Sequence, residues 1–276
     1  MIISGTDGND TLLGVAGADT IFGLGGDDYL YSRDPNDTLY AGDGNDRIQG
    51  AIDFTRGNLI YAGEGNDNIY GGATVYGGDG LDRMFLLGRQ DATAWGGEGN
   101  DVIYGQGGGE TTAYGDNGND LIDGGGNDDE LYGGSGSDKL YGNDNDDVLY
   151  GGNGGDYLRG DYLNDTLYGG AGNDTLVADH GNDTLTGGDG GDLFLVWVHP
   201  DNEGNDIITD FGAGDRMRIR GGVTDADGVW QAGDAGVTAV EGGIRLDFSV
   251  IYGVANSTLT VLGVDHLTFG TDVQFI

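Results

Sequence analysis

The chain has 276 residues, of which 61 are glycine and 2 are proline, and it contains no cysteine. Its 48 acidic and 11 basic residues give a formal net charge of −37 at pH 7. This acidity excludes nucleic acid as a partner, because both molecules are polyanions, and the lack of cysteine excludes disulfide bonds as a source of stability. The charge also opposes a compact state unless cations bind, so the cation-free chain is expected to be disordered.

The N-terminal residues carry no recognisable targeting or membrane segment. Met1 to Asp7 lack the basic and apolar regions of a signal peptide. No apolar run in the sequence is long enough to cross a membrane. Ile2 and Ile3 precede the first repeat directly, so either they cover this end of the fold or the end pairs with a second chain, and the oligomeric state stays open.

The dominant feature of the sequence is a period of nine residues. Aspartate recurs at every ninth position from Asp10 to Asp46 and again from Asp120 to Asp192. An apolar residue stands two positions after each of these aspartates, and Gly-Gly-x-Gly-x precedes many of them, as in Gly133 to Asp138. A fixed short period of this kind indicates a solenoid of stacked repeats.

Each repeat is predicted to consist of six loop residues followed by a three-residue strand. Glycine permits tight turns with positive φ, and the aspartate and backbone carbonyl oxygens are hard ligands that suit Ca²⁺. The single apolar residue of each repeat points inward and is buried only when repeats stack. Two repeats make one turn, so loops 18 residues apart lie above one another and share an ion.

The motif Gly-Gly-x-Gly-x-Asp-x-apolar-x, phased over roughly residues 5 to 195, resembles the repeats-in-toxin (RTX) family, also called hemolysin-type calcium-binding repeats. The resemblance implies an all-β fold, a parallel β-roll (a right-handed β-solenoid of nonapeptide repeats) with Ca²⁺ between the loops. It also implies type I secretion to an extracellular location. About a dozen bound Ca²⁺ ions would cancel most of the charge repulsion, so folding is expected on reaching calcium outside the cell.

The phase of the repeats assigns alternate loops to opposite edges of the roll. On the regular edge, every turn has an aspartate with glycine two residues before it, and the predicted calcium ligands are Asp10, Asp28, Asp46, Asp67, Asp82, Asp101, Asp120, Asp138, Asp156, Asp174 and Asp192. The opposite edge, here called the irregular edge, contributes the predicted ligands Asp19, Asp37, Asp129, Asp147, Asp165 and Asp183.

Four consecutive turns of the irregular edge lack the aspartate. Asn58, Ala73, Ala92 and Thr111 stand in its place. These turns vary in length and carry unusual residues, among them Arg56 and Arg89. Insertions in a solenoid gather on one face, which is often a binding face. These turns are therefore either decayed calcium sites or a binding patch.

A series of aromatic residues stands three positions after the aspartate position of the irregular edge. Strand alternation predicts that these side chains face outward and stack into a ladder. The ladder either stiffens the sheet or forms a ligand surface for sugar rings or protein. The candidate surface comprises Tyr61, Tyr76, Trp95, Tyr114 and Tyr132, with Arg56 and Arg89.

The period stops after Phe194, which divides the chain into a calcium-binding roll, 1–195, and a C-terminal capping region, 196–276. The segment from Gly204 to Met217 resembles the end cap of RTX domains in serralysin-type proteases and mannuronan epimerases. Strand-like runs then follow at 243–250, 257–264 and 272–276. The last run is a cap strand and also resembles the uncleaved type I secretion signal of the family.

No catalytic motif accompanies the repeats. His180, His199 and His266 lack the His-Glu-x-x-His spacing, and Gly-x-Ser-x-Gly is absent. The resemblance therefore implies an RTX domain that is not an enzyme, with calcium as its cofactor. Three roles stay open: adhesion to matrix, polysaccharide or a cell-surface component; a calcium-dependent substrate-binding module of an epimerase-like enzyme; or a membrane-active protein.

Overall fold

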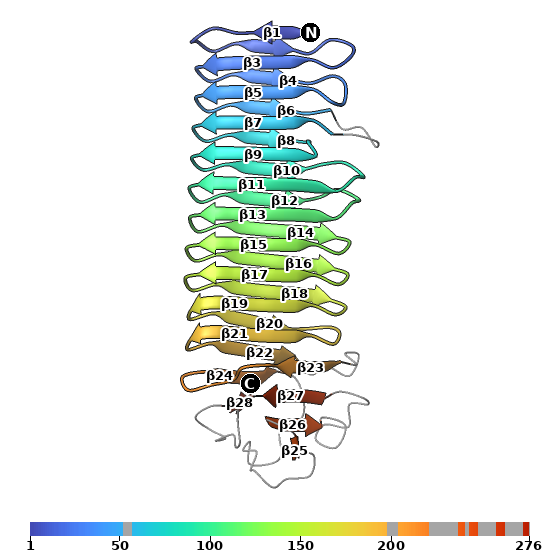
Figure 1. The fold of residues 1–276 in the computed structure, drawn as a ribbon, viewed down its shortest axis with the longest axis vertical. Helices are drawn as coiled ribbons and strands as arrows, with labels where there is room; N and C mark the ends of the chain where they lie inside the picture. The colour runs from blue at the N-terminus through green and yellow to red at the C-terminus, as the bar shows by residue number, and fades with distance from the viewer. Residues whose placement is uncertain are drawn as a thin grey trace. The chain divides into compact units, whose positions relative to one another are not determined.

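The computed structural model describes residues 1–51, 57–197, 204–220, 237–240, 243–247, 258–262 and 273–275. These ranges contain strands, turns and loops but no helix, and hence no helix that could span a membrane. The chain forms two compact units, residues 1–140 and 141–276. Each unit is built from stacked turns whose strands form two sheets (Figure 1).

In the first unit, odd-numbered strands form sheet A and even-numbered strands form sheet B. Sheet A runs β1 (Ile2–Ser4), β3 (Thr20–Gly25), β5 (Thr38–Asp43), β7 (Leu59–Glu64), β9 (Thr74–Asp79), β11 (Ala92–Glu98), β13 (Thr111–Asn117) and β15 (Glu130–Ser135). Sheet B runs β2 (Thr11–Leu13), β4 (Tyr29–Tyr31), β6 (Arg47–Gln49), β8 (Asn68–Tyr70), β10 (Arg83–Leu86), β12 (Val102–Gly105) and β14 (Leu121–Gly126). The division between the units falls within β16 (Lys139–Asp144).

The second unit repeats this plan and adds an antiparallel hairpin. Its sheet A runs β17 (Val148–Asn153), β19 (Thr166–Gly172), β21 (Thr184–Gly190), β23 (Asn205–Ile208), β27 (Thr258–Leu262), β26 (Gly243–Asp247) and β25 (Val237–Val240). Its sheet B runs β18 (Tyr157–Tyr162), β20 (Thr175–Ala178), β22 (Leu193–Trp197), β24 (Arg216–Arg220) and β28 (Val273–Phe275). The pairings of β26 with β25 and β27 are antiparallel, while β21, β23 and β27 pair in parallel.

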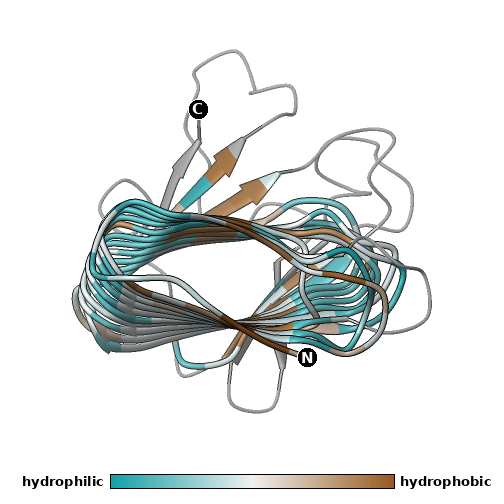
Figure 2. Ribbon diagram, turned by 90° about the horizontal axis from the view of Figure 1, so that it is seen from above, coloured by the Kyte–Doolittle hydropathy of each residue, from teal (hydrophilic) through white to brown (hydrophobic). Residues whose placement is uncertain are grey.

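The strand register confirms the predicted parallel roll with two repeats in each turn. Thr20 of β3 stands opposite Thr38 of β5, 18 residues later, and Ile21 stands opposite Leu39. From β3 onward, the central apolar residue of each strand points between the sheets and is fully buried, whereas Ile3 of β1 and Leu12 of β2 at the end of the stack are half-buried. In the first unit these residues are Ile21, Leu30, Leu39, Ile48, Ile60, Ile69, Val75, Met84, Ala94, Ile103, Ala113, Ile122 and Leu131. Figure 2 shows hydrophilic residues in the loops at both edges of the sheets.

The predicted length of three residues is right for β1, β2, β4, β6 and β8 but too short for β10, β12 and β14 of sheet B and for the later strands of sheet A. The strands β3 to β21 of that sheet span six or seven residues. They are longer because glycines after the apolar residue stay in the ladder, as where Gly42 pairs with Gly63. A Cβ atom on Gly63 would lie only 2.1 Å from the carbonyl oxygen of Gly42, so glycine is required for this approach.

Parallel stacking continues past residue 195, although the nine-residue period stops there. β23 pairs with β21, and β24 pairs with β22. The boundary at 195/196 stays a prediction. Of the three predicted runs in the tail, the described residues form β26, β27 and β28, and β25 is an additional strand. Arg56, His199, His266 and both ends of the predicted secretion signal lie outside the described residues.

Candidate calcium sites

A ladder of aspartates runs along the regular edge of each unit. The Oδ1 atom of each aspartate accepts a hydrogen bond from the backbone N–H of the aspartate one turn earlier, as Asp101 does from Asp82 at 2.8 Å. The first unit has this bond between Asp10 and Asp28, Asp28 and Asp46, Asp46 and Asp67, Asp67 and Asp82, Asp101 and Asp120, and Asp120 and Asp138. The second has it between Asp156 and Asp174, and Asp174 and Asp192. The ladder fixes each carboxylate in one orientation.

The second carboxylate oxygen of these residues has a different environment. Within the described residues, buried Oδ2 atoms without a hydrogen-bond partner belong on the regular edge to Asp28, Asp46, Asp67, Asp82, Asp101, Asp120, Asp174 and Asp192, and on the irregular edge to Asp165. An unsatisfied buried acceptor costs about 1–3 kcal/mol, and more when it is charged. Without a bound cation, this row of oxygens therefore opposes folding.

Most of these oxygens face a space from which side chains are excluded, because glycine stands five residues before the aspartate; at Asp46 and Asp67 that position is Ala41 and Ala62. A Cβ atom on Gly77 would lie 2.4 Å from Asp82 Oδ2 and 2.5 Å from the carbonyl oxygen of Gly96. We call such a carboxylate and carbonyl oxygen an oxygen pair. The same arrangement recurs at Asp101 with Gly115, Asp120 with Gly133, Asp156 with Gly169, and Asp174 with Gly187.

The oxygen pairs fit calcium in their chemistry. Their ligand atoms are carboxylate and backbone carbonyl oxygens, the donor set that Ca²⁺ prefers. No group of three or more His, Cys, Asp or Glu side chains converges on one point in the described part of the chain. The sites therefore depend on one or two carboxylates with backbone carbonyls, as expected from loops that glycine keeps close together.

Burial and neighbouring carboxylates perturb the titration of the ladder. Burial raises the pKa of Asp67 and Asp101 to about 7 and that of Asp165 to about 8. It raises the pKa to about 6 for Asp46, Asp82, Asp120, Asp138, Asp174 and Asp192, and to about 7 for Asp129 and Asp183. Adjacent carboxylates add to the effect. A divalent cation beside these oxygens would reverse it, because it favours the charged form.

Three predicted ligands already have protein donors at Oδ2. Asp10 accepts from the N–H and the hydroxyl of Thr6, at 2.6 and 2.8 Å. Asp37 accepts from the Ser32 hydroxyl at 2.7 Å, and Asp19 accepts from a backbone N–H at 2.7 Å. A hydrogen bond from the N-terminal ammonium lowers the pKa of Asp19. These carboxylates gain less from a cation than those with an unsatisfied Oδ2.

On the irregular edge, the stacking register confirms that Ala92 and Thr111 occupy the same column as the aspartates. Asn58 is buried there, and its amide nitrogen donates to Ser32 Oγ at 2.6 Å and to the Asp34 carbonyl at 3.2 Å. Thr111 is also buried, and its hydroxyl donates to a backbone carbonyl at 3.3 Å. Uncharged donors thus satisfy loop oxygens at two of the four turns.

The structure adds two aspartates that were not predicted as ligands. Asp206 Oδ1 accepts from the Asp183 N–H at 3.1 Å, and Asp215 Oδ1 accepts from the Asp192 N–H at 2.9 Å. On the irregular edge of the second unit, the same bond joins Asp147 to Asp165 and Asp165 to Asp183. The aspartate ladders of both edges are thus one turn longer than predicted. The steps are 23 residues instead of 18, which broke the period. The local signal was present, because Gly214 precedes Asp215 and an apolar residue follows two positions later.

The predicted aromatic ladder on sheet A is confirmed. In the first unit, ring centroids are 4.5–5.4 Å apart, and neighbouring planes differ by 9° or less, along Phe22, Tyr40, Tyr61, Tyr76, Trp95, Tyr114 and Tyr132. Since each ring covers the face of the next, the ladder presents ring edges and hydroxyls outward. Arg89 is exposed in a loop of the irregular edge. The role of these residues as a ligand surface stays a prediction.

A parallel roll with buried oxygen pairs along its loops defines a calcium-binding β-solenoid. The family model for the RTX calcium-binding nonapeptide repeat (four copies) matches residues 4–34, 36–53, 55–73, 88–111, 106–140, 124–158 and 159–194. The chain belongs to this family of calcium-binding RTX proteins.

Among solved structures, the chain is similar to the extracellular lipase LipA from Serratia marcescens, at 18% identity and a TM-score of 0.23. The match covers 100% of this chain and 40% of the lipase chain, so this chain spans less than half the length of that protein. No curated protein sequence matches the chain.

Proposed function

We propose that this protein is exported through type I secretion in a calcium-free, unfolded state and folds outside the cell when calcium reaches the oxygen pairs. The observation that carries the proposal is the row of buried Oδ2 atoms without protein partners. If each site has the affinity of extracellular calcium modules, with Kd of about 10⁻⁴–10⁻³ M, millimolar calcium adds up to about 1 kcal/mol for each site. Cytosolic calcium is too dilute to do so.

The residues that would hold calcium are the ladder aspartates with an unsatisfied Oδ2, together with glycine carbonyls of the adjacent turn. On the regular edge of the first unit these aspartates are Asp28, Asp46, Asp67, Asp82, Asp101 and Asp120. Bound calcium would supply the positive charge that these buried carboxylates otherwise lack. The proposed role requires no catalytic group.

The test is a calcium titration of the purified protein at pH 8, in which circular dichroism monitors the strand content. With a chelator the β signal should be lost, and it should return cooperatively at millimolar calcium. Equal concentrations of Mg²⁺ should not restore it, because Mg²⁺ loses its water reluctantly and demands a stricter geometry. Native-like strand content in the chelator would contradict the proposal.

A second role, association with extracellular polysaccharide or a cell surface, is favoured by the outer face of sheet A from β3 to β13, where the aromatic column and the column beside it carry no charge. Beside the aromatic ladder, Thr20, Thr38, Thr74, Thr93 and Thr112 are half-buried on the same face. In a chain of net charge −37, this neutral face rich in hydroxyls matches the hydrogen-bonding groups of a glycan.

This second role is tested by binding of the calcium-loaded protein to neutral polysaccharides. The double variant Trp95→Ala, Tyr114→Ala should lose binding, whereas Tyr70→Ala, Tyr104→Ala on sheet B should retain it. Equal binding by both variants would make the sheet A ladder purely structural. Leakage from liposomes would instead favour a membrane-active protein.

A further inference from the structure

The strand β24 is basic in an otherwise acidic molecule. Arg216, Arg218 and Arg220 are three of the 11 basic residues in the chain, and they alternate with Met217 and Ile219. Met217 and Ile219 are buried, at 0% and 1% exposure. Because alternate side chains of a strand face opposite ways, Arg216 and Arg218 lie on the outer face of sheet B in the second unit.

The described residues of the two neighbouring strands, β22 and β28, offer these arginines no counter-charge, and Gln274 of β28 stands beside Arg218. In the parallel register, Leu193 of β22 stands beside Arg216, and Leu195 stands beside Arg218. Among the described residues, no ion pair joins either arginine to a carboxylate. By contrast, Arg159 of the same sheet is paired with Asp161 at 2.7 Å and Asp179 at 2.6 Å. Pairing within the fold therefore accounts for Arg159 but not for Arg216 and Arg218.

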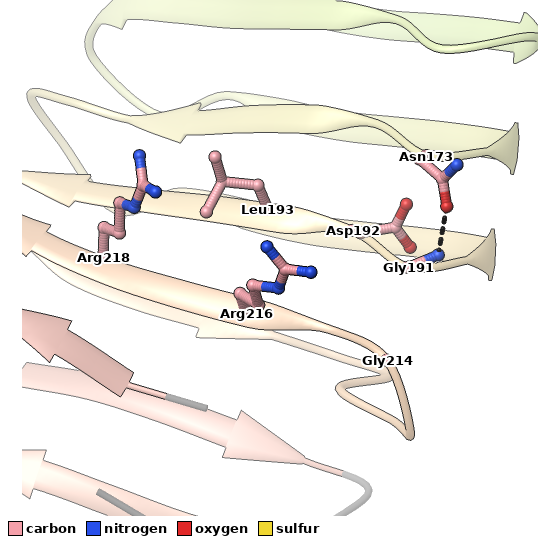
Figure 3. A pocket seen from close by; sticks show the side chains of 7 residues that line it. All are labelled: Asn173, Gly191, Asp192, Leu193, Gly214, Arg216 and Arg218. Carbon is pink, nitrogen blue, oxygen red and sulfur yellow. Dashed lines mark hydrogen bonds between the residues drawn. The ribbon is translucent and has the colours of Figure 1, made fainter. Parts of the chain in front are cut away.

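The two arginines border a hollow of about 450 Å³ at the regular edge. Its other lining residues are Asn173, Gly191, Asp192, Leu193 and Gly214. Figure 3 shows Arg216 and Leu193 beside the two loops that hold Gly191 and Gly214, with Arg218 farther along β24. The Asn173 side chain is held by the Gly191 N–H at 2.9 Å. The hollow thus combines two guanidinium groups, the half-buried side chain of Leu193, and two glycines, Gly191 and Gly214, whose backbone carries no side chain.

We infer that this hollow binds an acidic sugar unit of an anionic polysaccharide. A guanidinium group binds carboxylate or sulfate with two parallel hydrogen bonds. Arg216 and Arg218 are about 6.6 Å apart along the strand, so they reach two anionic groups of one polymer. Leu193 and Leu195 offer apolar surface to the ring carbons of the sugar. The inference deepens the proposed surface association and gives it a site in the second unit.

The hollow also couples anion binding to calcium. Asp192 lines it, and its Oδ2 is one of the buried oxygens without a partner. A charged Asp192 beside Arg216 repels an anionic ligand, whereas calcium held by Asp192 would add positive charge to the hollow. Binding of the acidic polymer therefore requires calcium even in molecules that are already folded.

The test is binding of the calcium-loaded protein to hyaluronan, dextran sulfate and uncharged dextran, measured by calorimetry. The first two polymers distinguish carboxylate from sulfate as the recognised group. The double variant Arg216→Gln, Arg218→Gln should weaken binding of the preferred anionic polymer at least about tenfold. The control, Arg47→Gln, Arg83→Gln, changes the net charge equally at two exposed arginines of sheet B in the first unit, and it should weaken binding less than about twofold.

Circular dichroism of each variant in calcium separates this inference from the proposed folding. A variant that folds with calcium but does not bind supports the site. If the glutamine variant does not fold, Arg216→Lys, Arg218→Lys keeps the charge, removes the guanidinium fork and should still weaken binding. Equal weakening by the control, or no binding of either anionic polymer by the folded wild type, would overturn the inference. A protein dimer that the Arg216 and Arg218 variant dissociates would show that the occupant is a second copy.

Discussion

The two loop edges of the first unit both stack their turns closely, but the buried polar groups of the two edges have different partners. On the regular edge, each turn from Asp28 to Asp120 buries a carboxylate oxygen that has no protein donor. On the irregular edge, the Asn58 amide donates to Ser32 Oγ and the Asp34 carbonyl, and the Thr111 hydroxyl donates to the Gly124 carbonyl of β14. Stacked loops therefore do not need an ion in every turn. Under the proposed function, the regular edge makes folding respond to calcium, while the donors at Asn58 and Thr111 keep their turns paired without an ion.

The largest expected effect is that of pH on the calcium-free protein. Burial raises the pKa of Asp67 and Asp101 to about 7 and of Asp82 to about 6, so at intermediate pH the folded state binds more protons than the unfolded state. Stability must then fall as pH rises through the folded pKa values. We expect the chelated protein to be folded near pH 5 and unfolded near pH 8, as measured by circular dichroism.

The calcium-loaded protein should show the opposite trend, because protons compete with calcium for the same oxygens. Its apparent calcium affinity should fall as pH drops below about 6. If the chelated protein were equally unfolded at both pH values, the raised pKa values of the regular edge would not govern folding.

Next in size is a substitution on each edge. Asp101→Ala removes a ladder acceptor and a proposed calcium ligand, and it should lower the free energy of unfolding in calcium by about 3 kcal/mol. Thr111→Ala removes one long hydroxyl bond and should cost about 1 kcal/mol. Urea unfolding in calcium measures both. Equal losses would show that the edges do not differ in their dependence on the ion.

A third effect isolates the donor that replaces the ion. Asn58→Ala leaves Ser32 Oγ and the Asp34 carbonyl without the amide donor, and it should cost about 2 kcal/mol. The loss should be the same at pH 5 in chelator and at pH 8 in calcium, because no ion is involved. Calcium affinity, measured by titration of the folded variant, should be unchanged. A loss confined to the calcium-loaded state would show that Asn58 belongs to a calcium site.

Most of the fold and the main row of aspartates were predictable because the period places each residue on the same position of the next turn. One Asp, one apolar residue and one aromatic residue thus predict a carboxylate row, a core column and a ring ladder. The features that were not predicted lie outside the nine-residue period. Asp206 and Asp215 follow steps of 23 residues. The Asn58 contact depends on Ser32, 26 residues away at a position the repeat does not specify.

The smallest expected effect compares the glycine position of the two edges in the second unit. On the irregular edge Leu163 has φ of 78°, a left-handed conformation that costs a bulky residue about 1–2 kcal/mol. Its side chain is 52% exposed, so its burial contributes little to stability. Leu163→Gly should therefore raise the free energy of unfolding by about 1 kcal/mol, after allowing for the greater freedom of glycine in the unfolded chain.

The regular edge supplies the matched control at Gly172. A Cβ atom there would lie 1.4 Å from the Gly154 carbonyl oxygen, so Gly172→Ala must push two turns apart and destabilise the roll. Urea unfolding of both variants in calcium measures the difference. If Leu163→Gly stabilises the protein and Gly172→Ala destabilises it, the turns beside the aspartate row of the regular edge approach too closely for any residue but glycine. The same result would show that Leu163 is tolerated on the irregular edge although its backbone is strained. If Leu163→Gly destabilised the protein, the leucine would be contributing packing that outweighs its conformation.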